Sequence, residues 1–413
     1  MDSPSNCMQP VLNFRDKGFR ENPHGVYTAL RRESSWAKVD GVEATLVLRH
    51  AECDTLLKDH RLGLVEYNSE AFAEEHPLKS YFQMREGLML FANSPRHEEL
   101  RTPAKSSLSP RVIKRYEDIV RSLAKKAVAN LAERLAGGKV VDFVNDISIP
   151  FVSRVICEVV GMPDQDHALL ARMTQEVADG LDPLGPRHSL SKAGDAYIEF
   201  QEYMRQELQK GRWKDLESFT NTFLGDIAAC PHMLGGFRNH EDLISTTVML
   251  LSAGHLTTNH SLSLSLESLL SDESRCGILS DGSQSITPLM VEEFFRFHSP
   301  AQITRRVVRE QLEIEGGKVF YPGQAIWLGL ASANRDERVF RNAQSLDFDR
   351  KPNPHLAFGG GQHYCLGMHL ARLQLRVFLE ELQSEKLVMK IRSATPDHNI
   401  IFRGLKQLLL VRG

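Results

Sequence analysis

The chain has 413 residues, of which 42% are hydrophobic and 25% charged, and its formal net charge is −3. This balance is ordinary for a globular protein and argues against a nucleic-acid binder, which usually carries a basic excess. The length is enough for two or three domains or for one large enzyme fold.

The cysteines and the N-terminus indicate the compartment. The six cysteines contain no CxxC pair and no regular spacing, which excludes a disulfide framework or a zinc finger and fits a reducing cytosol. The first residues contain no basic stretch followed by an apolar one, so we expect no secretory signal. No window approaches the roughly 18 uninterrupted apolar residues of a membrane span. We therefore expect a cytoplasmic monomer with neither nucleic acid nor membrane as partner.

The first half of the chain is predicted to be mostly helical. Helices over 24–33 and 51–60 flank a strand-like segment at 44–49. Further helical patterns follow over 96–108, 112–136, 147–160, 165–180, 191–210 and 215–229. The longest pattern covers 240–272, where Asn239 is a candidate cap with Asp242 three residues later. A helix of that length is about 45 Å long, enough to cross a domain.

The last third changes character. A helix over 287–298 opens with Thr287 and Pro288, a cap followed by proline at the first helical position. The segment 312–330 has two strand-like runs, 334–364 is rich in loop residues, and 366–383 is an amphipathic helix. We predict one mainly α domain over 1–413. Its small β-rich lobe comprises mainly 35–50 and 312–330 plus the C-terminal strands, and its helical lobe comprises the remainder.

The stretch FGGGQHYCLG, residues 358–367, carries the strongest chemical signal. Cys365 precedes the last helix, whose N-terminal N–H groups and dipole favour a thiolate. The glycines at 359–361 permit tight turns and let the loop lie flat against a large group, and Gly367 allows close approach from the helix side. An axial haem ligand requires such a thiolate. A buried structural thiol, or a nucleophile with His363 as its base, are the alternatives.

The stretch resembles the haem-binding signature of the cytochrome P-450 family, F-x-x-G-x-[HR]-x-C-x-G, at every specified position, and the resemblance extends over nearly the whole chain. It is similar to the soluble bacterial branch. The resemblance implies a helical prism around haem b and a monooxygenase of class 1.14. In that family the cysteine, here Cys365, is the axial thiolate that favours O–O cleavage, with Phe358 beside the sulfur.

The resemblance also implies how the haem is held. Glu293 and Arg296 match the family's E-x-x-R pair, which joins an arginine, here Arg350, to fix the loop before the cysteine. The remaining cofactor-binding residues that the resemblance implies are Gly359, Gly361, His363 and Gly367 in the loop, and His97, Arg101, Arg306 and His355 at the propionates. Arg305 competes with Arg306, which fits better by its spacing to LEIEG.

The segment AGHLTTNH, 253–260, is similar to the oxygen-binding stretch of the family. Gly254 is expected to let the helix approach the haem. The hydroxyl of Thr257 can bond back to the carbonyl of Ala253 and open the helix for dioxygen. The family usually has Asp or Glu where this chain has Leu256. Protons would then come through water, His255, Thr258 or the substrate, or the enzyme would run oxidative ring closure or coupling instead of hydroxylation.

The electron source and the substrate are less defined. No iron–sulfur or flavin segment is present, so we expect a separate ferredoxin and its reductase. Lys105, Arg111, Arg372 and Arg376 would suit an acidic ferredoxin, although a solvated charged face explains them equally well.

By resemblance, the substrate pocket is lined by 60–92, by Met249, Ser252, Gln302, Ile303 and Ile401, and by a lid at 181–190. We expect a medium-sized natural-product intermediate. A non-catalytic haem-thiolate protein and an unrelated cysteine enzyme remain competing interpretations.

Overall fold

The structure is a computed structural model that describes residues 9–211, 222–229, 236–315, 317–397 and 399–413. These divide into two compact units, one formed by 1–65 and 295–365 and the other by 66–294 and 366–413. Each is described by itself below. No helix in the described part of the chain combines the length and apolar character needed to cross a membrane.

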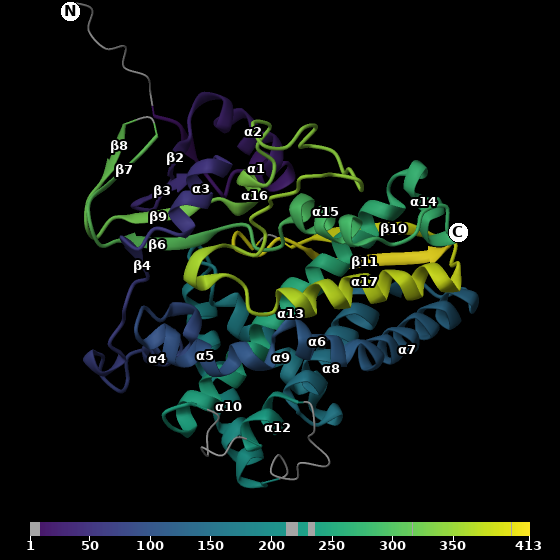
Figure 1. Ribbon diagram of the computed structural model, residues 1–413, viewed down its shortest axis with the longest axis horizontal. Helices are drawn as coiled ribbons and strands as arrows, with labels where there is room; N and C mark the ends of the chain where they lie inside the picture. The colour runs from purple at the N-terminus through teal and green to yellow at the C-terminus, as the bar shows by residue number, and fades with distance from the viewer. Residues whose placement is uncertain (1–8, 212–221, 230–235, 316, 398) are drawn as a thin grey trace, which may run out of the picture. The chain divides into compact units, whose positions relative to one another are not determined.

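The first unit is built on a six-stranded sheet with strand order β1-β2-β3-β9-β6-β4 (Figure 1). The six strands are β1 (Val11–Leu12), β2 (Trp36–Val39), β3 (Ala44–Val47), β4 (Leu62–Gly63), β6 (Thr304–Val308) and β9 (Ala325–Leu328). A separate hairpin pairs β7 (Leu312–Ile314) with β8 (Lys318–Phe320). The helices are α1 (Lys17–Glu21), α2 (Pro23–Glu33), α3 (His50–Leu57), α16 (Leu330–Ala333) and the short η7 (Gly361–His363).

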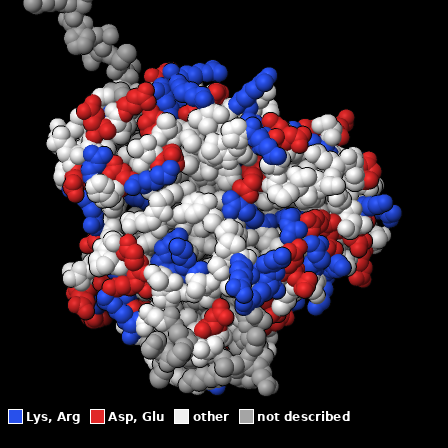
Figure 2. Space-filling view, in the orientation of Figure 1, with Lys and Arg blue, Asp and Glu red and all other residues white. Residues whose placement is uncertain are grey.

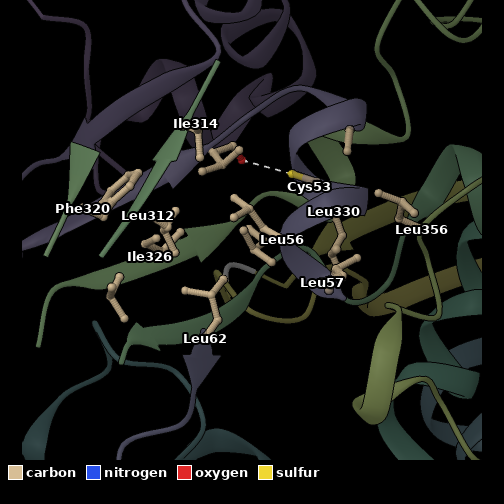
Figure 3. Close-up of a cluster of buried hydrophobic side chains, with 14 residues drawn as sticks. Cys53, Leu56, Leu57, Leu62, Leu312, Ile314, Phe320, Ile326, Leu330 and Leu356 are labelled. Atoms are coloured by element: carbon tan, nitrogen blue, oxygen red, sulfur yellow. Dashed lines mark hydrogen bonds between the residues drawn. The ribbon is translucent and has the colours of Figure 1, made fainter. Parts of the chain in front are cut away.

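A compact apolar core lies between α3 and the strands of this unit. Figure 3 shows Leu56 and Leu57 of α3 in one apolar cluster with Leu62, Ile326 and Leu330. Cys53 is fully buried, and its sulfur lies 3.5 Å from the carbonyl oxygen of Val47 (dashed line in Figure 3). Burial of such side chains is the main favourable contribution to folding. The core thus ties the early α3 to strands that come more than two hundred residues later.

The second unit is mainly helical. Its α-helices are α4 (Lys79–Gly87), α5 (Arg96–Ser107), α6 (Pro110–Ile113), α7 (Glu117–Ala136), α8 (Ile149–Val160), α9 (His167–Asp179), α10 (Arg187–Gln209), α12 (Phe223–Ala228), α13 (His240–Leu270), α14 (Glu273–Ser280) and α17 (Met368–Glu385). Short 3-10 turns are η1 (Ser69–Ala71), η2 (Met89–Phe91), η3 (Lys114–Tyr116) and η5 (Asp164–Asp166), and η4 (Phe143–Ser148) is a π-helical turn. The long α13 packs against α8, α9, α10 and α17, and α17 lies along α7 (Figure 1). Helix α15 (Pro288–His298) spans the boundary between the two units.

A three-stranded sheet completes the second unit. Strand β11 (Leu405–Arg412) pairs antiparallel with β10 (Met389–Pro396) and with β5 (Val141–Asp142). The C-terminal strands, which we grouped with the β-rich lobe, therefore lie in the helical unit, because β11 finds its partner at β5. The single-domain assignment stays a prediction.

The mainly α fold class with a small β-rich part is confirmed, as are the principal helices. The side chain of Asn239 caps α13 by accepting from the amide of Asp242 at 2.8 Å, and Thr287 accepts from the amide of Met290 at 3.2 Å. The helix expected over 112–136 is interrupted by η3, since Lys114–Tyr116 forms a tighter turn. Of the helix expected over 215–229, only Phe223–Ala228 is observed, and 215–221 lie outside the described residues.

Candidate functional site

The loop that carries Cys365 is held by its own backbone. The amide of Cys365 donates to the carbonyl of Phe358 at 3.0 Å, and the amide of Tyr364 donates to the carbonyl of Gly361 at 3.1 Å. Cys365 is half-buried, and α17 begins three residues later, at Met368. The backbone thus presents the thiol at a defined place at the end of the loop.

The glycines of this loop have a structural role within the chain. Gly359 and Gly361 have φ of +69° and +63°, which favour glycine. A Cβ at Gly361 would lie 2.3 Å from the carbonyl oxygen of Leu57 in α3, so only glycine fits there. Gly360 also packs against Leu57. Contact with α3 thus gives Gly360 and Gly361 a role in chain packing, whereas a Cβ at Gly359 would meet its nearest atom at 3.9 Å and one at Gly367 would meet nothing within 4 Å.

Aromatic packing fixes the start of the loop. The ring of Phe358 lies 4.7 Å from that of Phe295 and 5.8 Å from that of His355, centroid to centroid. The Nδ1 atom of His355 accepts from the amide of Ala357 at 3.3 Å. His363 is half-buried in η7. The roles of Phe358 beside a sulfur, and of His355 and His363 at a cofactor, stay predictions.

Two other cysteines are poor candidates for a metal-ligating thiolate. Burial raises the pKa of the Cys53 thiol well above its ordinary value and raises that of Cys157 to about 12. The thiol of Cys276 lies 3.5 Å from the carbonyl of Leu270. Cys365 is therefore the described cysteine whose loop best presents a thiolate.

Arg296 holds the irregular segment that precedes the cysteine loop. Its guanidinium is fully buried and donates to the carbonyls of Asn334, Ala343 and Ser345, at 2.8, 2.9 and 3.0 Å. Arg350 is also buried and donates to the carbonyl of Arg341 at 2.7 Å. Both guanidinium groups lie within 6 Å of the ring of Phe340. These contacts support the expected task of the two arginines.

Glu293 lies one turn before Arg296 on α15 and is fully buried. The expected ion-paired triad of Glu293, Arg296 and Arg350 stays a prediction. The hydrogen bonds given above for Arg296 go to backbone carbonyls, which carry no net charge.

Sequence reasoning missed two further residues of this network. Asn334 donates to the hydroxyl of Ser299 at 2.7 Å and accepts from the amide of Leu356 at 2.6 Å. The Nε2 atom of His50 lies 2.7 Å from the carbonyl of Pro354. The available signal was the polar run at 334–337 directly after an apolar segment, which is too weak to assign such contacts.

Arg306 is a buried cation without an acidic partner among the described residues. It is 8% exposed, and its hydrogen bonds go to the hydroxyl of Thr304 and the carbonyl of Arg305, at 2.9 and 2.8 Å. Burial lowers its pKa to about 10. Because a buried guanidinium is costly unless an anion faces it, the site is suited to a bound carboxylate.

Most of helix α13 is buried, but residues 252–254 and 257 are partly or fully exposed, and these four form the open stripe of the helix. Ala253 is exposed, and Ser252, Gly254 and Thr257 are half-buried. The hydroxyl of Thr257 donates to the carbonyl of Ala253 at 3.1 Å, the hydrogen bond expected from the sequence. The helix nevertheless continues without a break, so no local opening is observed.

Other residues of this stretch face neighbouring helices. A Cβ at Gly254 would lie 3.0 Å from Cδ1 of Ile156, so the glycine lets α13 approach α8. His255 is buried with its Nδ1 atom 3.1 Å from the hydroxyl of Ser153, also in α8. Burial lowers the pKa of His255 to about 4, which makes it a neutral side chain near pH 7. Leu256 and Thr258 are buried too.

The remaining predicted residues are dispersed. His97, buried, and Arg101, half-buried, lie one turn apart on α5, and their propionate role stays a prediction. Met249 and Ile401 are buried in the second unit, and Ile303 is buried in the first. The amide of Gln302 donates to the carbonyls of His298 and Ser299 at the end of α15. The amide nitrogen of Gln302 is thus engaged in two hydrogen bonds within the chain, and its role as a substrate contact stays a prediction.

The segment 181–190 is less free than a lid would be. Its last residues, from Arg187, already belong to α10. The carboxylate of Asp182 accepts from the amides of Leu184 and Ile400, at 2.8 and 3.3 Å. The lid role stays a prediction.

Comparison with known proteins assigns the family. The model of the family "Cytochrome P450" matches residues 285–385. Cytochrome P450 126 of Mycobacterium tuberculosis is 30% identical over 388 residues, which cover 90% of this chain and 88% of that protein. The chain belongs to the cytochrome P450 family.

Two further similarities agree. The biotin biosynthesis cytochrome P450 of Bacillus subtilis is 29% identical over 369 residues, 88% of this chain and 89% of that protein. The crystal structure of P450BioI in complex with hexadec-9Z-enoic acid ligated acyl carrier protein matches with a TM-score of 0.83 at 26% identity, covering 96% of this chain and 99% of that chain. This cytochrome P450 is accordingly an oxidoreductase of the monooxygenase type and has the cytochrome P450 fold.

Cytochromes P450 carry haem bound by a cysteine thiolate, and the residues of this chain fit such a group. Cys365 is a half-buried thiol at the end of a fixed loop. Arg306 is a buried cation that requires an anion, as a haem propionate would provide. The stripe at Ala253 is open in a helix that is otherwise largely buried. Cys365 and Arg306, both in the first unit, offer the thiolate and the cation that such a group needs.

The basic residues considered for a redox partner of this cytochrome P450 are partly neutralised. Arg372 binds both carboxylate oxygens of Glu292, at 2.6 and 2.9 Å. Arg376 donates to Glu117 and Glu380, both at 2.9 Å. Lys105 and Arg111 are exposed. A cavity of about 290 Å³ lies among α6, α7, α15 and α17, beside these pairs. Figure 2 shows basic and acidic side chains mixed over the α7 and α17 region.

Proposed function

We propose that this cytochrome P450 binds haem b with Cys365 as its axial thiolate and oxidises a medium-sized organic substrate. The observation that carries the proposal is the loop in which the amide of Cys365 is bonded to the carbonyl of Phe358. Bound haem would supply the activation of O2 with electrons from separate proteins. Arg306, His355, His97 and Arg101 are proposed to hold its propionates, with Arg296, Arg350 and Glu293 supporting the loop. Gly359, Gly361, His363 and Gly367 are proposed to shape that loop around the cofactor.

The reduced CO-difference spectrum tests this assignment. Wild-type protein is expected to give a Soret band at the position typical of thiolate ligation, and Cys365→Ser is expected to lose it. Cys276→Ser, at a half-buried thiol outside the loop, is the matched control and should keep the band. Retention of the band in Cys365→Ser would exclude Cys365 as the ligand.

We also propose that Thr257 and Ala253 would take part in binding dioxygen, with Gly254 and Thr258 beside them in the helix. The open stripe on α13 and the Thr257–Ala253 hydrogen bond support this placement. Ser252 supports a polar substrate group, because its buried hydroxyl oxygen has no hydrogen-bond partner among the described residues. Met249, Ile303 and Ile401 are proposed as apolar lining. The relative named for biotin biosynthesis supports a biosynthetic intermediate as the substrate.

Leu256 favours a second candidate, oxidative coupling or ring closure. It is buried at the position where the family usually has an acid, so a carboxylate is missing from the expected proton path. Leu256→Glu compared with the uncharged Leu256→Gln separates the two. If the glutamate variant alone raises the share of consumed NADPH that appears as product, proton supply limits the wild type. Equal coupling in both variants and an unchanged product pattern would show that Leu256 does not restrict proton delivery.

Electrons are proposed to come from a ferredoxin and its reductase in the cytoplasm, with the chain acting as a monomer. Exposed Lys105 and Arg111 support docking of an acidic partner, whereas Arg372 and Arg376 are already paired with carboxylates. NADPH consumption with surrogate ferredoxin and reductase, together with product detection, distinguishes an enzyme from a haem protein that only binds a ligand. Consumption without any product across candidate substrates would favour the latter.

A further inference from the structure

A second buried guanidinium, that of Arg85 in α4, has no acidic partner in the described part of the chain. Arg85 is 7% exposed, and no ion pair joins it to an Asp or Glu among the residues that the structure describes. Its Nε atom is buried without a hydrogen-bond partner. Its hydrogen bond to the hydroxyl of Tyr81 is long, at 3.4 Å. The group is therefore charged, largely removed from water and incompletely satisfied.

The nearby carboxylates are used elsewhere. Glu86, next along α4, accepts from the hydroxyl and the amide of Ser69, at 2.6 and 3.2 Å. Glu66 accepts from the side chain of Asn93 at 2.7 Å. These two carboxylates thus accept from other side chains, and among the described residues no carboxylate forms an ion pair with Arg85.

Aromatic rings hold the guanidinium in place. Its carbon lies 3.7 Å from the ring centroid of Phe91 and 5.1 Å from that of Tyr67. Tyr67 in turn stacks on Phe82 at 5.2 Å, and Phe82 on Phe72 at 4.2 Å. Cation–π contacts offset only part of the cost of burying a charge, and they leave the edge of the guanidinium free to donate. The rings of Phe91 and Tyr67 thus face the guanidinium, and those of Phe82 and Phe72 extend the aromatic cluster.

This cluster lies against the helix that carries the open stripe. Phe91 belongs to η2, which contacts α13. A Cβ at Gly87, two residues after Arg85, would first meet the hydroxyl oxygen of Tyr197 in α10 and would lie 3.6 Å from that of Ser245 in α13, to which Tyr197 is hydrogen-bonded at 3.0 Å. Ser245, Met249 and Ala253 are spaced i, i+4, i+8 and share one face of that helix. Ala253 is therefore about 12 Å along α13 from Ser245, a span that an extended apolar chain can bridge.

We infer that Arg85 binds the carboxylate of an apolar carboxylic acid, so that the acid's hydrocarbon portion runs along α13 toward Ala253. The inference rests on the proposed function, since it places the oxidised carbon at the open stripe. A guanidinium fork matches a carboxylate in a bidentate geometry, whereas an uncharged amide or alcohol would leave the buried charge unpaired. The preference for acids over their neutral analogues is thus a property of one residue.

Titration calorimetry of the haem-loaded protein with dodecanoate and dodecanamide tests this directly. Wild type is expected to bind the acid at least about tenfold more tightly than the amide. Arg85→Gln should reduce that ratio to near one, and Arg85→Lys should retain part of it. Arg172→Gln, which changes an exposed arginine of α9, is the matched control and should leave the ratio unchanged.

Three results would overturn the inference: equal affinity of wild type for acid and amide, no binding of octanoate, dodecanoate or hexadecanoate, and an acid preference that survives in Arg85→Gln. The first two use wild-type protein alone and do not depend on the folding of a variant. The CO-difference spectrum is recorded on the same samples. A thiolate band without a preference for acids would contradict the role of Arg85 and leave the proposed function standing. A preference for acids without that band would contradict the proposed function and leave the role of Arg85 standing.

Discussion

The carbonyl oxygen of Leu57 occupies the place where a side chain at Gly361 would begin, because a Cβ on Gly361 would lie 2.3 Å from it. Leu57 is the last residue of α3, and Gly361 opens the turn that leads to Cys365. The end of one helix thus sets the path of the cysteine loop. A carbonyl belongs to the backbone and cannot rotate away as a flexible side chain can.

Gly361→Ala is therefore expected to be more harmful than Gly359→Ala. Both glycines have positive φ, which costs alanine about 1–2 kcal/mol. Only Gly361 adds the clash with Leu57, since a Cβ at Gly359 would meet its nearest atom, the carbonyl of His363, at 3.9 Å. Thermal unfolding and haem content measure the difference. Equal losses in the two variants would mean that the backbone conformation alone matters and that the contact with α3 does not.

Arg296→Met should destabilise the protein severely. It removes the donor from three buried carbonyls, and each buried unsatisfied acceptor costs about 1–3 kcal/mol, so a loss of at least about 3 kcal/mol is expected. Chemical denaturation gives the free energy of unfolding, and limited proteolysis is expected to cleave within 334–350. Arg341→Met, at an exposed arginine of the same segment, is the control. Comparable stability of the two variants would contradict the role given to Arg296.

Arg306→Met is expected to separate stability from cofactor retention. Burial lowers the pKa of Arg306 to about 10, because the charged form has lost its water without gaining an anion. Replacing it with an apolar residue removes that cost, so the haem-free protein should unfold at the same or a higher temperature. Haem transfer to apomyoglobin should become at least about tenfold faster, since a charge-assisted contact is lost. Unchanged transfer would exclude Arg306 as a propionate contact.

His260 provides a test by pH. Burial lowers its pKa from 6.5 to about 4, so between these values the unfolded chain binds a proton that the native protein does not. The free energy of unfolding therefore decreases as pH falls from 6.5 to about 4, by about 3 kcal/mol in total. His260→Gln should flatten the dependence of unfolding free energy on pH by about one proton, whereas His188→Gln, at an exposed site, should not. An unchanged slope in His260→Gln would refute the buried state.

Sequence patterns predicted correctly those features that depend on interactions between neighbouring residues. The caps at Asn239 and Thr287 depend on residues within a few positions of each other, and the sequence predicted both correctly. The contact between Leu57 and Gly361 joins residues about three hundred positions apart, so no periodicity could reveal it. The contact gives Gly361 a role in chain packing, and the role of the glycines at a cofactor stays a prediction.

The same limit applies to individual side chains. The sequence made Gln302 a candidate substrate contact, which stays a prediction, and its amide nitrogen donates to the carbonyls of His298 and Ser299 at the end of α15. Arg85 belongs to no recognisable sequence motif. Its lack of an ion pair depends on the contacts that Glu86 and Glu66 make in the folded chain, which the sequence does not reveal. Whether a buried charged side chain has an oppositely charged partner depends on the folded chain and cannot be predicted from neighbouring residues in the sequence.

Gly254 and Ile156 allow packing and chemistry to be separated. Gly254→Ala gains about 1 kcal/mol of helix propensity but places its Cβ 3.0 Å from Cδ1 of Ile156, an overpacking that costs about 1–3 kcal/mol. Ile156→Val removes that atom, so the double variant should recover the stability lost by Gly254→Ala, with a coupling of at least about 1 kcal/mol. Additive effects in the thermodynamic cycle would show that the two residues do not interact.

Turnover by the double variant then decides what the glycine is for. Restored stability together with restored product formation means that Gly254 serves the packing of α13 on α8. Restored stability with product formation still lost means that turnover depends on how α13 packs on α8 and not on stability alone, since a methyl group at 254 points toward Ile156. In that case the packing of Gly254 on Ile156 also sets the position of the neighbouring Ala253 and Thr257, and turnover is more sensitive to this packing than unfolding is.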